Sequence, residues 1–262
     1  MSKWLTFEKF SKPLKLKNPI LIEGLPGIGN VGKIAIDYII DNVKPTLIYQ
    51  IHSHNFPHSV FLSEDNTIEL PSVKIYRYEG KERDILLLGG DVQPLDEVSS
   101  YEFCEEVLNF VEKVGCKEII TLGGIGMPDL VKDPKIFGAV TSANALKKYK
   151  KFKNIDFKIN QKIEAIVGAT GLLLGLGNLR GIDGVSLLAE THAHQTHLGF
   201  NEAKVLVENL NQILNLKIDV KNLEKATEET ETKQNQSEKT ILKKSAAPKI
   251  KVIGEKPVYY IS

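Results

Sequence analysis

Hydrophobic and polar positions follow two spacings along this chain. Short, nearly continuous apolar runs such as residues 118–124 are typical of strands that are buried on both faces. Apolar residues spaced three and four positions apart, as in residues 201–216, are typical of a helix with one buried stripe. The two patterns alternate through most of the chain. We therefore predict an α/β fold, with a mostly parallel central sheet and helices on both faces.

The same two patterns place the other elements. A further strand is predicted at residues 163–171, ahead of the glycine- and leucine-rich residues 172–181. The other predicted strands are residues 20–22, 46–51, 59–62, 72–78, 83–90 and 185–191, and the other predicted helices are residues 31–43 and 97–114.

The composition changes after Val220. Residues 221–240 are polar, charged and poor in aromatic side chains, so they cannot bury enough surface to offset the chain entropy lost on folding. Apolar residues return in the last stretch, IKVIGEKPVYYIS. We therefore divide the chain into an α/β domain (1–220), a charged flexible linker (221–247) and a C-terminal tail (248–262).

The overall composition limits the function classes. The 262-residue chain has a net charge of +1, and no apolar segment approaches the ~20 residues that span a bilayer. The balanced charge gives no electrostatic case for binding nucleic acid or a membrane surface. The two cysteines, Cys104 and Cys116, suit a reducing compartment, and Cys104 is expected to be a buried structural thiol. We therefore expect a soluble cytoplasmic protein without nucleic-acid or membrane partners.

A glycine-dense turn follows the first buried run. GIGNVG (27–32) matches the GxGxxG pattern of dinucleotide sites, and with Lys33 it matches the start of a phosphate-binding loop. Ile34 replaces the hydroxyl residue that follows the lysine in such loops, and the next strand ends at Gln50 and Ile51 rather than at an acid. We interpret the turn as a corner where small residues let a strand and a helix pack closely. The alternative is a nucleoside- or nucleotide-binding enzyme that uses this turn and its lysine.

The six histidines fall in two short segments, each beside a predicted strand end. Such clusters can bind zinc if the fold brings them together over one cleft, and carboxylates at other strand ends would complete the site. A metal-dependent hydrolase is therefore an alternative function, and the other interpretation is loop histidines without a metal. The candidate groups are His52, His54, His58, His192, His194, His197, Asp91 and Glu190.

Two pairs of segments resemble one family. The first pair is LIEGLPGIGNVGKIAIDYII (21–40) and YQIHSHNFPHSVFL (49–62). The second pair is GATGLLLGLGNLRGIDGVSLLAET (168–191) and NEAKVLVENLNQILNLKID (201–219). The order of strand, glycine turn, helix, later glycine-rich segment, LLAET strand and amphipathic helix resembles the archaeal branch of the proteasome assembly chaperone family. The resemblance extends over residues 18–220.

The resemblance implies a non-enzymatic binding protein. Members of that family have an α/β fold akin to the nucleoside phosphorylases, without the catalytic site. They bind the α-subunits of the proteasome core particle and assist ring assembly, and archaeal members form homo-oligomers. By this resemblance we expect a proteasome assembly chaperone or binding protein with no catalytic residues, no cofactor and no metal.

The resemblance also gives the C-terminal tail a role. Some family members end in a hydrophobic residue, a tyrosine and any residue, and this tail enters pockets between α-subunits, where a lysine receives the terminal carboxylate. Here the tyrosines come earlier, because Ile261 holds the penultimate place. The alternative is that the tail pairs as an edge strand with its own domain or with a neighbouring subunit. The candidate partner-binding residues are Val258, Tyr259, Tyr260, Ile261 and Ser262.

Overall fold

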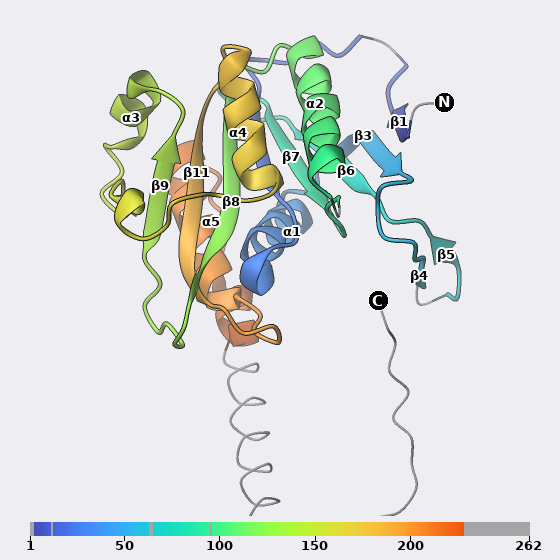
Figure 1. Ribbon diagram of the computed structural model, residues 1–262. Helices are drawn as coiled ribbons and strands as arrows, with labels where there is room; N and C mark the ends of the chain where they lie inside the picture. The colour runs from blue at the N-terminus through green and yellow to red at the C-terminus, as the bar shows by residue number, and fades with distance from the viewer. Residues whose placement is uncertain (1–2, 12, 63–64, 95, 228–262) are drawn as a thin grey trace, which may run out of the picture.

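The computed structural model describes residues 3–11, 13–62, 65–94 and 96–227 of the chain. Within these residues a large sheet lies between two layers of helices (Figure 1). The sheet contains nine of the described strands, in the order β1-β3-β6-β7-β2-β8-β11-β9-β10. In that order their bounds are Trp4–Glu8, Thr46–Ser53, Val73–Tyr78, Ile85–Gly90, Ile20–Gly24, Glu118–Met127, Asp183–His192, Ile136–Val140 and Ile155–Asp156.

Strand direction divides the sheet into a centre and two flanks. The central strands β7, β2, β8 and β11 are parallel. On one flank β1, β3 and β6 pair antiparallel with their neighbours, and on the other flank β9 pairs antiparallel with β11 and parallel with β10. Among the described strands of this sheet four neighbouring pairs are parallel and four are antiparallel, so the prediction of a mostly parallel sheet is wrong. Apolar runs report burial and not direction, and the chain passes from β3 to β6 and on to β7 without a crossover helix. The likeness to nucleoside phosphorylases stays a prediction.

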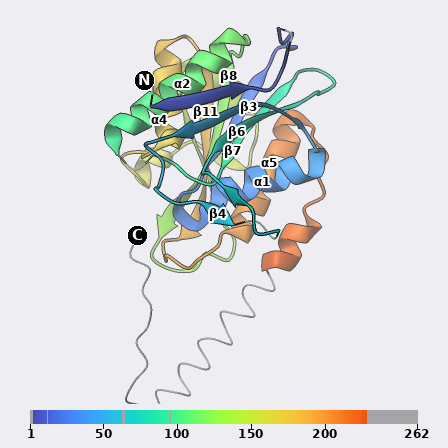
Figure 2. The same cartoon turned by 90° about the vertical axis from the view of Figure 1, so that its right-hand side faces the viewer.

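Two helix layers cover the sheet (Figures 1 and 2). One face carries α2 (Glu97–Lys113) and α4 (Ala169–Leu179), which contact each other. The other face carries α1 (Val31–Val43) and α5 (Phe200–Leu214), with the short helix α3 (Ala143–Tyr149) on the same side. The prediction of helices on both faces is confirmed. No helix in the described part of the chain is long and apolar enough to cross a membrane.

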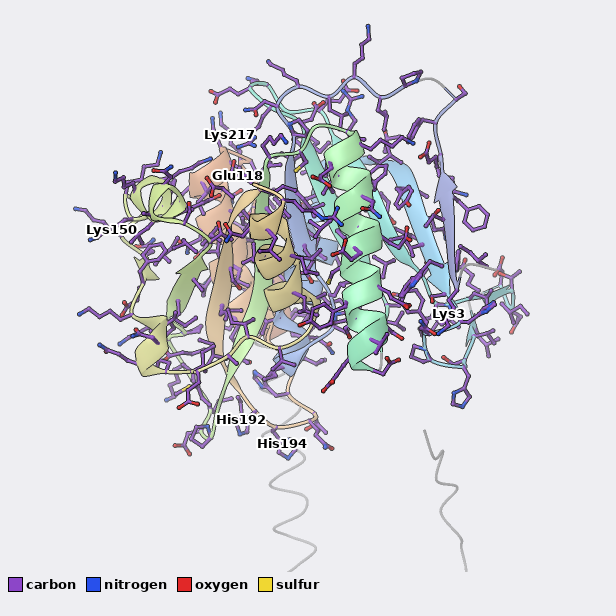
Figure 3. The ribbon with its side chains drawn as sticks, turned by 45° about the horizontal axis from the view of Figure 1, so that its top comes forward. Lys3, Glu118, Lys150, His192, His194 and Lys217 are labelled. Carbon is purple, nitrogen blue, oxygen red and sulfur yellow. The ribbon has the colours of Figure 1, made fainter. Side chains whose placement is uncertain are left out.

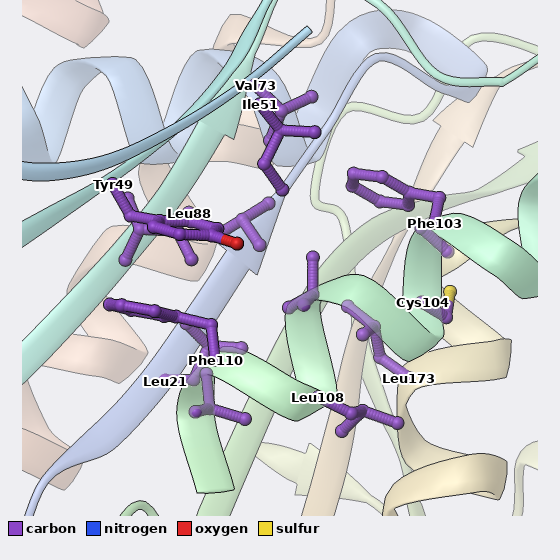
Figure 4. Close-up of a cluster of buried hydrophobic side chains, with 14 of the residues drawn as sticks. Leu21, Tyr49, Ile51, Val73, Leu88, Phe103, Cys104, Leu108, Phe110 and Leu173 are labelled. Carbon is purple, nitrogen blue, oxygen red and sulfur yellow. The ribbon is translucent and has the colours of Figure 1, made fainter. Parts of the chain in front are cut away.

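The core consists of two main clusters, one on each face of the sheet. Successive side chains of a strand point to opposite faces, so in β2 Leu21 packs toward α2 and α4, whereas Ile20 and Ile22 pack toward α1 and α5. In the α2/α4 cluster Tyr49 stacks on Phe110 with ring centroids 4.1 Å apart (Figure 4). Burial on both faces explains why the central strands are continuous apolar runs in the sequence.

One predicted strand is wrong. Residues 163–168 form a loop, and the next residues begin α4, which takes in most of the glycine- and leucine-rich residues 172–181. Gly168 has a φ of 82°, a left-handed conformation that ends any extended run. A short apolar run bounded by glycine does not distinguish a strand from a partly buried loop. The hydrophobic pattern also does not predict β1, β9, β10 or α3.

A separate two-stranded hairpin comes between β3 and β6 in the chain. It pairs β4 (Phe61–Leu62) with β5 (Ile68–Glu69). The hairpin projects from one flank of the molecule (Figure 1). The predicted strand at residues 59–62 corresponds to β4.

The start of the predicted linker packs on the domain. Residues 221–227 are helical, and Leu223 is buried in the α1/α5 cluster. Glu224 forms a 2.9 Å ion pair with Lys204 of α5. The remaining linker residues and the tail lie outside the described residues, so the division of the chain into three parts stays a prediction.

Candidate functional site

The glycine turn joins β2 to α1 at the carboxyl edge of the parallel strands. A Cβ atom placed on Gly24 would lie 2.2 Å from the carbonyl oxygen of Gly32, and one placed on Gly32 would lie 2.4 Å from the carbonyl oxygen of Leu122 in β8. Neither oxygen can move aside easily, because both belong to the backbone of packed elements. These glycines therefore let α1 lie directly against β2 and β8, which confirms the close-packing interpretation.

Gly29 fixes the turn against the end of β11. It has a φ of 62°, which glycine adopts without a steric cost, and a Cβ atom there would lie 2.7 Å from Oγ1 of Thr191. The backbone N–H of Gly199 donates to the carbonyl oxygen of Gly29 over 2.8 Å. The turn, the end of β11 and the loop before α5 therefore form one packed unit, which brings together segments 21–40 and 168–191 of the family resemblance.

Carboxylates hold Lys33, the lysine of the phosphate-loop-like pattern. Its Nζ lies 2.8 Å from Asp37 and 3.3 Å from Asp91, and it donates to the carbonyl oxygen of Gly90. Burial lowers the pKa of Lys33, but the hydrogen bonds and charges of the two aspartates outweigh burial and raise the pKa above its usual value. A phosphate at the turn would have to compete with two carboxylates for this lysine.

A buried carboxylate lies beside the turn, in the first turn of α5. Oε1 of Glu202 accepts a hydrogen bond from Oγ1 of Thr191 and lies 2.8 Å from Nε2 of His197. Glu202 is 2% exposed, and Nδ1 of His197 is buried with no hydrogen-bond partner among the described residues. The carboxylate stands between the hydroxyl and the imidazole, so the imidazole is not placed to take the hydroxyl proton as in a nucleophile–base–acid triad. This arrangement fixes a loop and does not activate a nucleophile.

The histidines of the second segment gather at this edge, and those of the first segment do not join them. The rings of His194 and His197 each lie 5.7 Å from the ring of His192, and Figure 3 shows His192 and His194 at the same edge of the molecule. His52 lies on β3, where its Nδ1 is 3.0 Å from the carbonyl oxygen of Pro71. β3 and β11 are five strand positions apart, about 24 Å at ~4.8 Å per strand.

One metal site shared by both histidine segments is therefore ruled out by the strand order. His54 and His58 follow in the loop after β3, on the distant flank. The described residues contain no group of three or more His, Cys, Asp or Glu side chains placed to hold a metal ion. The candidate carboxylates have other partners, since Asp91 contacts the lysine of the glycine turn and Glu190 accepts a hydrogen bond from Lys162 over 3.1 Å.

Glu23, on the α2/α4 face of β2, is a buried acid that the hydrophobic pattern does not mark as a candidate. Its Oε1 accepts a hydrogen bond from the backbone N–H of Leu25 over 3.1 Å, and its Oε2 has no partner among the described residues. Burial raises the pKa of Glu23 to about 8, so the carboxyl group is mostly protonated at neutral pH. The signal in the sequence is a single acid within the apolar run ILIEG.

Both cysteines are free and buried in the core. Burial raises the pKa of each thiol, and for Cys104 the charge of Glu23 adds to the effect. A thiol must ionise to act as a nucleophile. The prediction that Cys104 is a buried structural thiol is confirmed.

The predicted partner-binding residues lie outside the described part of the chain. Their role therefore stays a prediction from the sequence. They are Val258, Tyr259, Tyr260, Ile261 and Ser262.

A comparison with known families identifies the family to which the packed unit around the glycine turn belongs. The sequence model of the PAC2 family matches residues 21–237, which include the turn, α4, β11 and α5. This chain belongs to the PAC2 family. The PAC2 match ends before the C-terminal tail, so the assignment rests mainly on the folded domain. The resemblance inferred from the two pairs of segments is confirmed.

The solved structures similar to this PAC2 family chain include two proteins from Pyrococcus furiosus. PbaB, described as an archaeal proteasome activator, has a TM-score of 0.84 at 32% identity, over 91% of this chain and 100% of the PbaB chain. PbaA, described as an archaeal homolog of proteasome-assembly chaperone, has a TM-score of 0.74 at 25% identity, over 88% of this chain and 92% of the PbaA chain. The uncharacterized protein MJ1210 of Methanocaldococcus jannaschii is 33% identical over 210 residues, which cover 80% of this chain and 79% of that protein.

Proposed function

We propose that this PAC2 family member is a non-enzymatic binding protein of the proteasome core particle, acting in the cytoplasm in core-particle assembly or activation. The observation that carries the proposal is the similarity to the whole PbaB chain, with a TM-score of 0.84 and 32% identity. Similarity to PbaA, a homolog of proteasome-assembly chaperone, supports a role in the same process.

The chemistry at the carboxyl edge of the sheet supports binding without catalysis. Lys33 is engaged by Asp37 and Asp91, and His197 is engaged by the buried carboxylate of Glu202. Each of these groups has a structural partner that competes with any substrate. Catalysis needs acid and base groups poised near neutral pH and open to the reacting atoms.

We further propose that the folded domain contacts the α-subunits and that the tail makes a second, tethered contact. The 35 residues beyond Thr227 would span about 30–35 Å as a flexible chain, at 5–6 Å × √n. A tethered tail binds at a raised effective concentration, so weak docking of the last residues would still add affinity. The terminal carboxylate would give a partner lysine a charge-assisted contact.

A titration of the full chain against purified core particle and against isolated α-subunits tests the proposal. We expect binding to both, and we expect deletion of residues 258–262 to weaken binding by roughly tenfold or more through lost avidity. The matched control deletes residues 234–238 from the linker, which removes the same number of residues and keeps the tail. Peptide hydrolysis by the core particle, and the rate of ring formation from α-subunits, then separate activation from assembly.

One result would reject this proposal as a whole, and another would reject its second part. Failure of the folded full chain to bind either the core particle or α-subunits would reject the proposed function as a whole. Equal binding by the tail deletion and the linker deletion would remove the tail from the mechanism and leave the domain contact.

A further inference from the structure

Six loops of the described chain lie at the carboxyl edge of the parallel strands, the edge that holds the glycine turn. β3 and β7 each pair antiparallel with β6, so these two strands run parallel to each other. The β4–β5 hairpin, which follows β3, therefore lies at the carboxyl edge as well. The described residues of the six loops are 25–30, 54–62 with 65–72, 91–94 with 96, 128–135, 163–168 and 193–199.

The hairpin exposes an apolar face at this edge. Leu62 is paired directly with Ile68, and alternate residues of a strand share a side, so Val60 and Leu70 lie with them. Leu62 is 76% exposed and Ile68 is 68% exposed. The hairpin forms a sheet of its own, and an isolated two-stranded hairpin is marginally stable in water. The hairpin face therefore needs a surface that covers it.

Four of the other loops at the carboxyl edge also expose a large apolar side chain. Val167, in the loop before α4, is 89% exposed. At the opposite edge of the sheet, Leu179 at the end of α4 is the one exposed large apolar side chain among the described residues. Apolar patches of this kind on the surface of a soluble protein mark sites of interaction. We name as the apolar edge the residues Ile28, Leu62, Ile68, Leu130, Val167 and Leu198.

The described chain also ends at the carboxyl edge. After α5 it turns back along that helix, because Ile218 exchanges hydrogen bonds with the side chain of Asn211. Further on, Glu224 pairs with Lys204, which lies nearer the start of α5 and so nearer the carboxyl edge. Figure 1 shows the coloured ribbon ending at the lower side of the molecule, the side to which the hairpin projects.

The position of this chain end limits how a bound tail can orient the domain. The 35 residues beyond Thr227 span only about 30–35 Å as a flexible chain. A tail that docks on a partner therefore keeps the carboxyl edge close to that partner.

The loops of the carboxyl edge carry more acids than bases. Their described residues include seven acids and two lysines. Lys33 pairs with Asp91, and the charge of Lys3 acts on Asp96, so two of these acids have a cation from a neighbouring element. Five acids then stand against the two lysines of the loops. The matching partner surface combines apolar side chains with lysine or arginine.

We propose that the apolar edge is the surface through which the folded domain contacts the α-subunits of the proteasome core particle, with the hairpin face as the main contact. This inference rests on the proposed function and specifies which face of the domain binds. The tail and the apolar edge then act on the same side of the molecule, so one partner surface can engage both.

Charged substitutions test the apolar edge in the full chain. Leu62→Asp and Leu130→Asp place a carboxylate in two separate loops, and each should raise the Kd for the core particle by roughly tenfold or more, because the charge would be buried against apolar surface. Leu179→Asp is the matched control. It makes the same change at a leucine that is 83% exposed at the opposite edge, and it should leave the Kd within about twofold of the natural value.

The tail deletion isolates the domain contact. In a chain that lacks residues 258–262, Leu62→Asp should remove the binding that remains, whereas Leu179→Asp should not. Failure of the natural full chain to bind would reject the proposed function itself, before any variant is compared. Binding by the natural chain with no loss in Leu62→Asp or Leu130→Asp, or with an equal loss in Leu179→Asp, would overturn the apolar edge and leave the proposed function standing.

Thiol labelling gives a second measurement that needs no charged variant. Both natural cysteines are buried, so Leu62→Cys or Leu179→Cys adds one accessible thiol. Saturating core particle should slow maleimide labelling of residue 62 by roughly tenfold and leave residue 179 unchanged, because an interface excludes solvent from its centre. Equal labelling of residue 62 in the free and bound chains would overturn the proposal. Slow labelling of residue 62 in the free chain, relieved by dilution, would assign the hairpin face to a contact between copies and would also overturn it.

Discussion

Nε2 of His197 lies 2.8 Å from Oε1 of Glu202, and their side chains are only 10% and 3% exposed. This contact ties the loop before α5 to the first turn of that helix. Thr191 donates to the same carboxylate oxygen, so the end of β11 joins the unit. A buried polar group that loses its partner costs about 1–3 kcal/mol, which makes the contact testable through stability.

Glu202→Ala should lower the free energy of unfolding by about 2–3 kcal/mol, because both His197 and Thr191 lose their acceptor in a buried site. Urea denaturation monitored by circular dichroism measures the effect. The control is Glu208→Ala on the same helix, where the side chain is partly exposed and a change within about 0.5 kcal/mol is expected. Equal losses for the two variants would show that the contact adds nothing to stability.

Gly32→Ala tests the close approach of α1 to β8. Alanine favours a helix, but its Cβ would lie 2.4 Å from the carbonyl oxygen of Leu122, so we expect a net loss of about 1–3 kcal/mol from overpacking. Gly27→Ala is the control in the same turn, because a Cβ there meets no described atom within 4 Å and its φ of −163° is extended. Thermal unfolding of both variants separates a packing requirement from a general effect of the motif. A stable Gly32→Ala variant would contradict the packing account.

The elements that the sequence predicts best are those whose burial follows a regular pattern, either continuous or with the period of a helix. The run at residues 118–124 is buried almost throughout and lies within β8, and the stripe of residues 201–216 is α5 with small shifts at its ends. Strand direction could not be predicted, because burial on both faces is the same for parallel and antiparallel neighbours. The loop at residues 163–168 was open to misassignment because its apolar side chains pack partly against the domain, as those of a strand would.

The candidate site also has features that the sequence predicts and features that it does not. The glycine turn could be interpreted from local chemistry, since its missing hydroxyl and acid are visible within one stretch of sequence. The contact of His197 with Glu202 and Thr191 depends on how a loop folds back on β11, which no local pattern encodes. The separation of the two histidine segments depends on strand order, and Glu23 is noticed only when its strand is known to be buried on both faces.

Glu118 lies at the edge of the sheet opposite His192 and His194 (Figure 3). Its side chain should stabilise the fold more as pH rises. It accepts hydrogen bonds from Arg83 and Tyr149, each over 2.6 Å, and from Lys148. Burial raises the pKa of Glu118, but these bonds outweigh burial and hold the pKa below its usual value of 4.5. The folded protein therefore releases this proton more readily than the unfolded chain, and the stabilisation is lost as pH falls through the lowered pKa.

Glu118→Gln should accordingly be less stable than the natural chain at pH 7, and the difference should shrink below pH 4.5. Urea denaturation at several pH values between 3 and 7 measures the difference in unfolding free energy. Glu164→Gln, at an exposed position, is the control and should follow the natural chain throughout. A difference that is constant with pH would mean that the charge of Glu118 plays no part in its stabilising effect.

Glu23 should make the fold less stable as pH rises, which is the opposite of the effect of Glu118. Its pKa is about 8 in the folded protein against 4.5 for an unperturbed glutamate, so between these values the folded state holds a proton that the unfolded chain has released. The folded state then binds more protons, and stability falls as pH rises from 4.5 to 8. Glu23→Gln keeps the shape without an ionisable group, so its stability advantage over the natural chain should grow across this window and level off above pH 8. Unfolding free energies of both chains from pH 5 to 9 measure this growth, and two parallel curves would mean that the buried carboxyl group does not titrate with an elevated pKa.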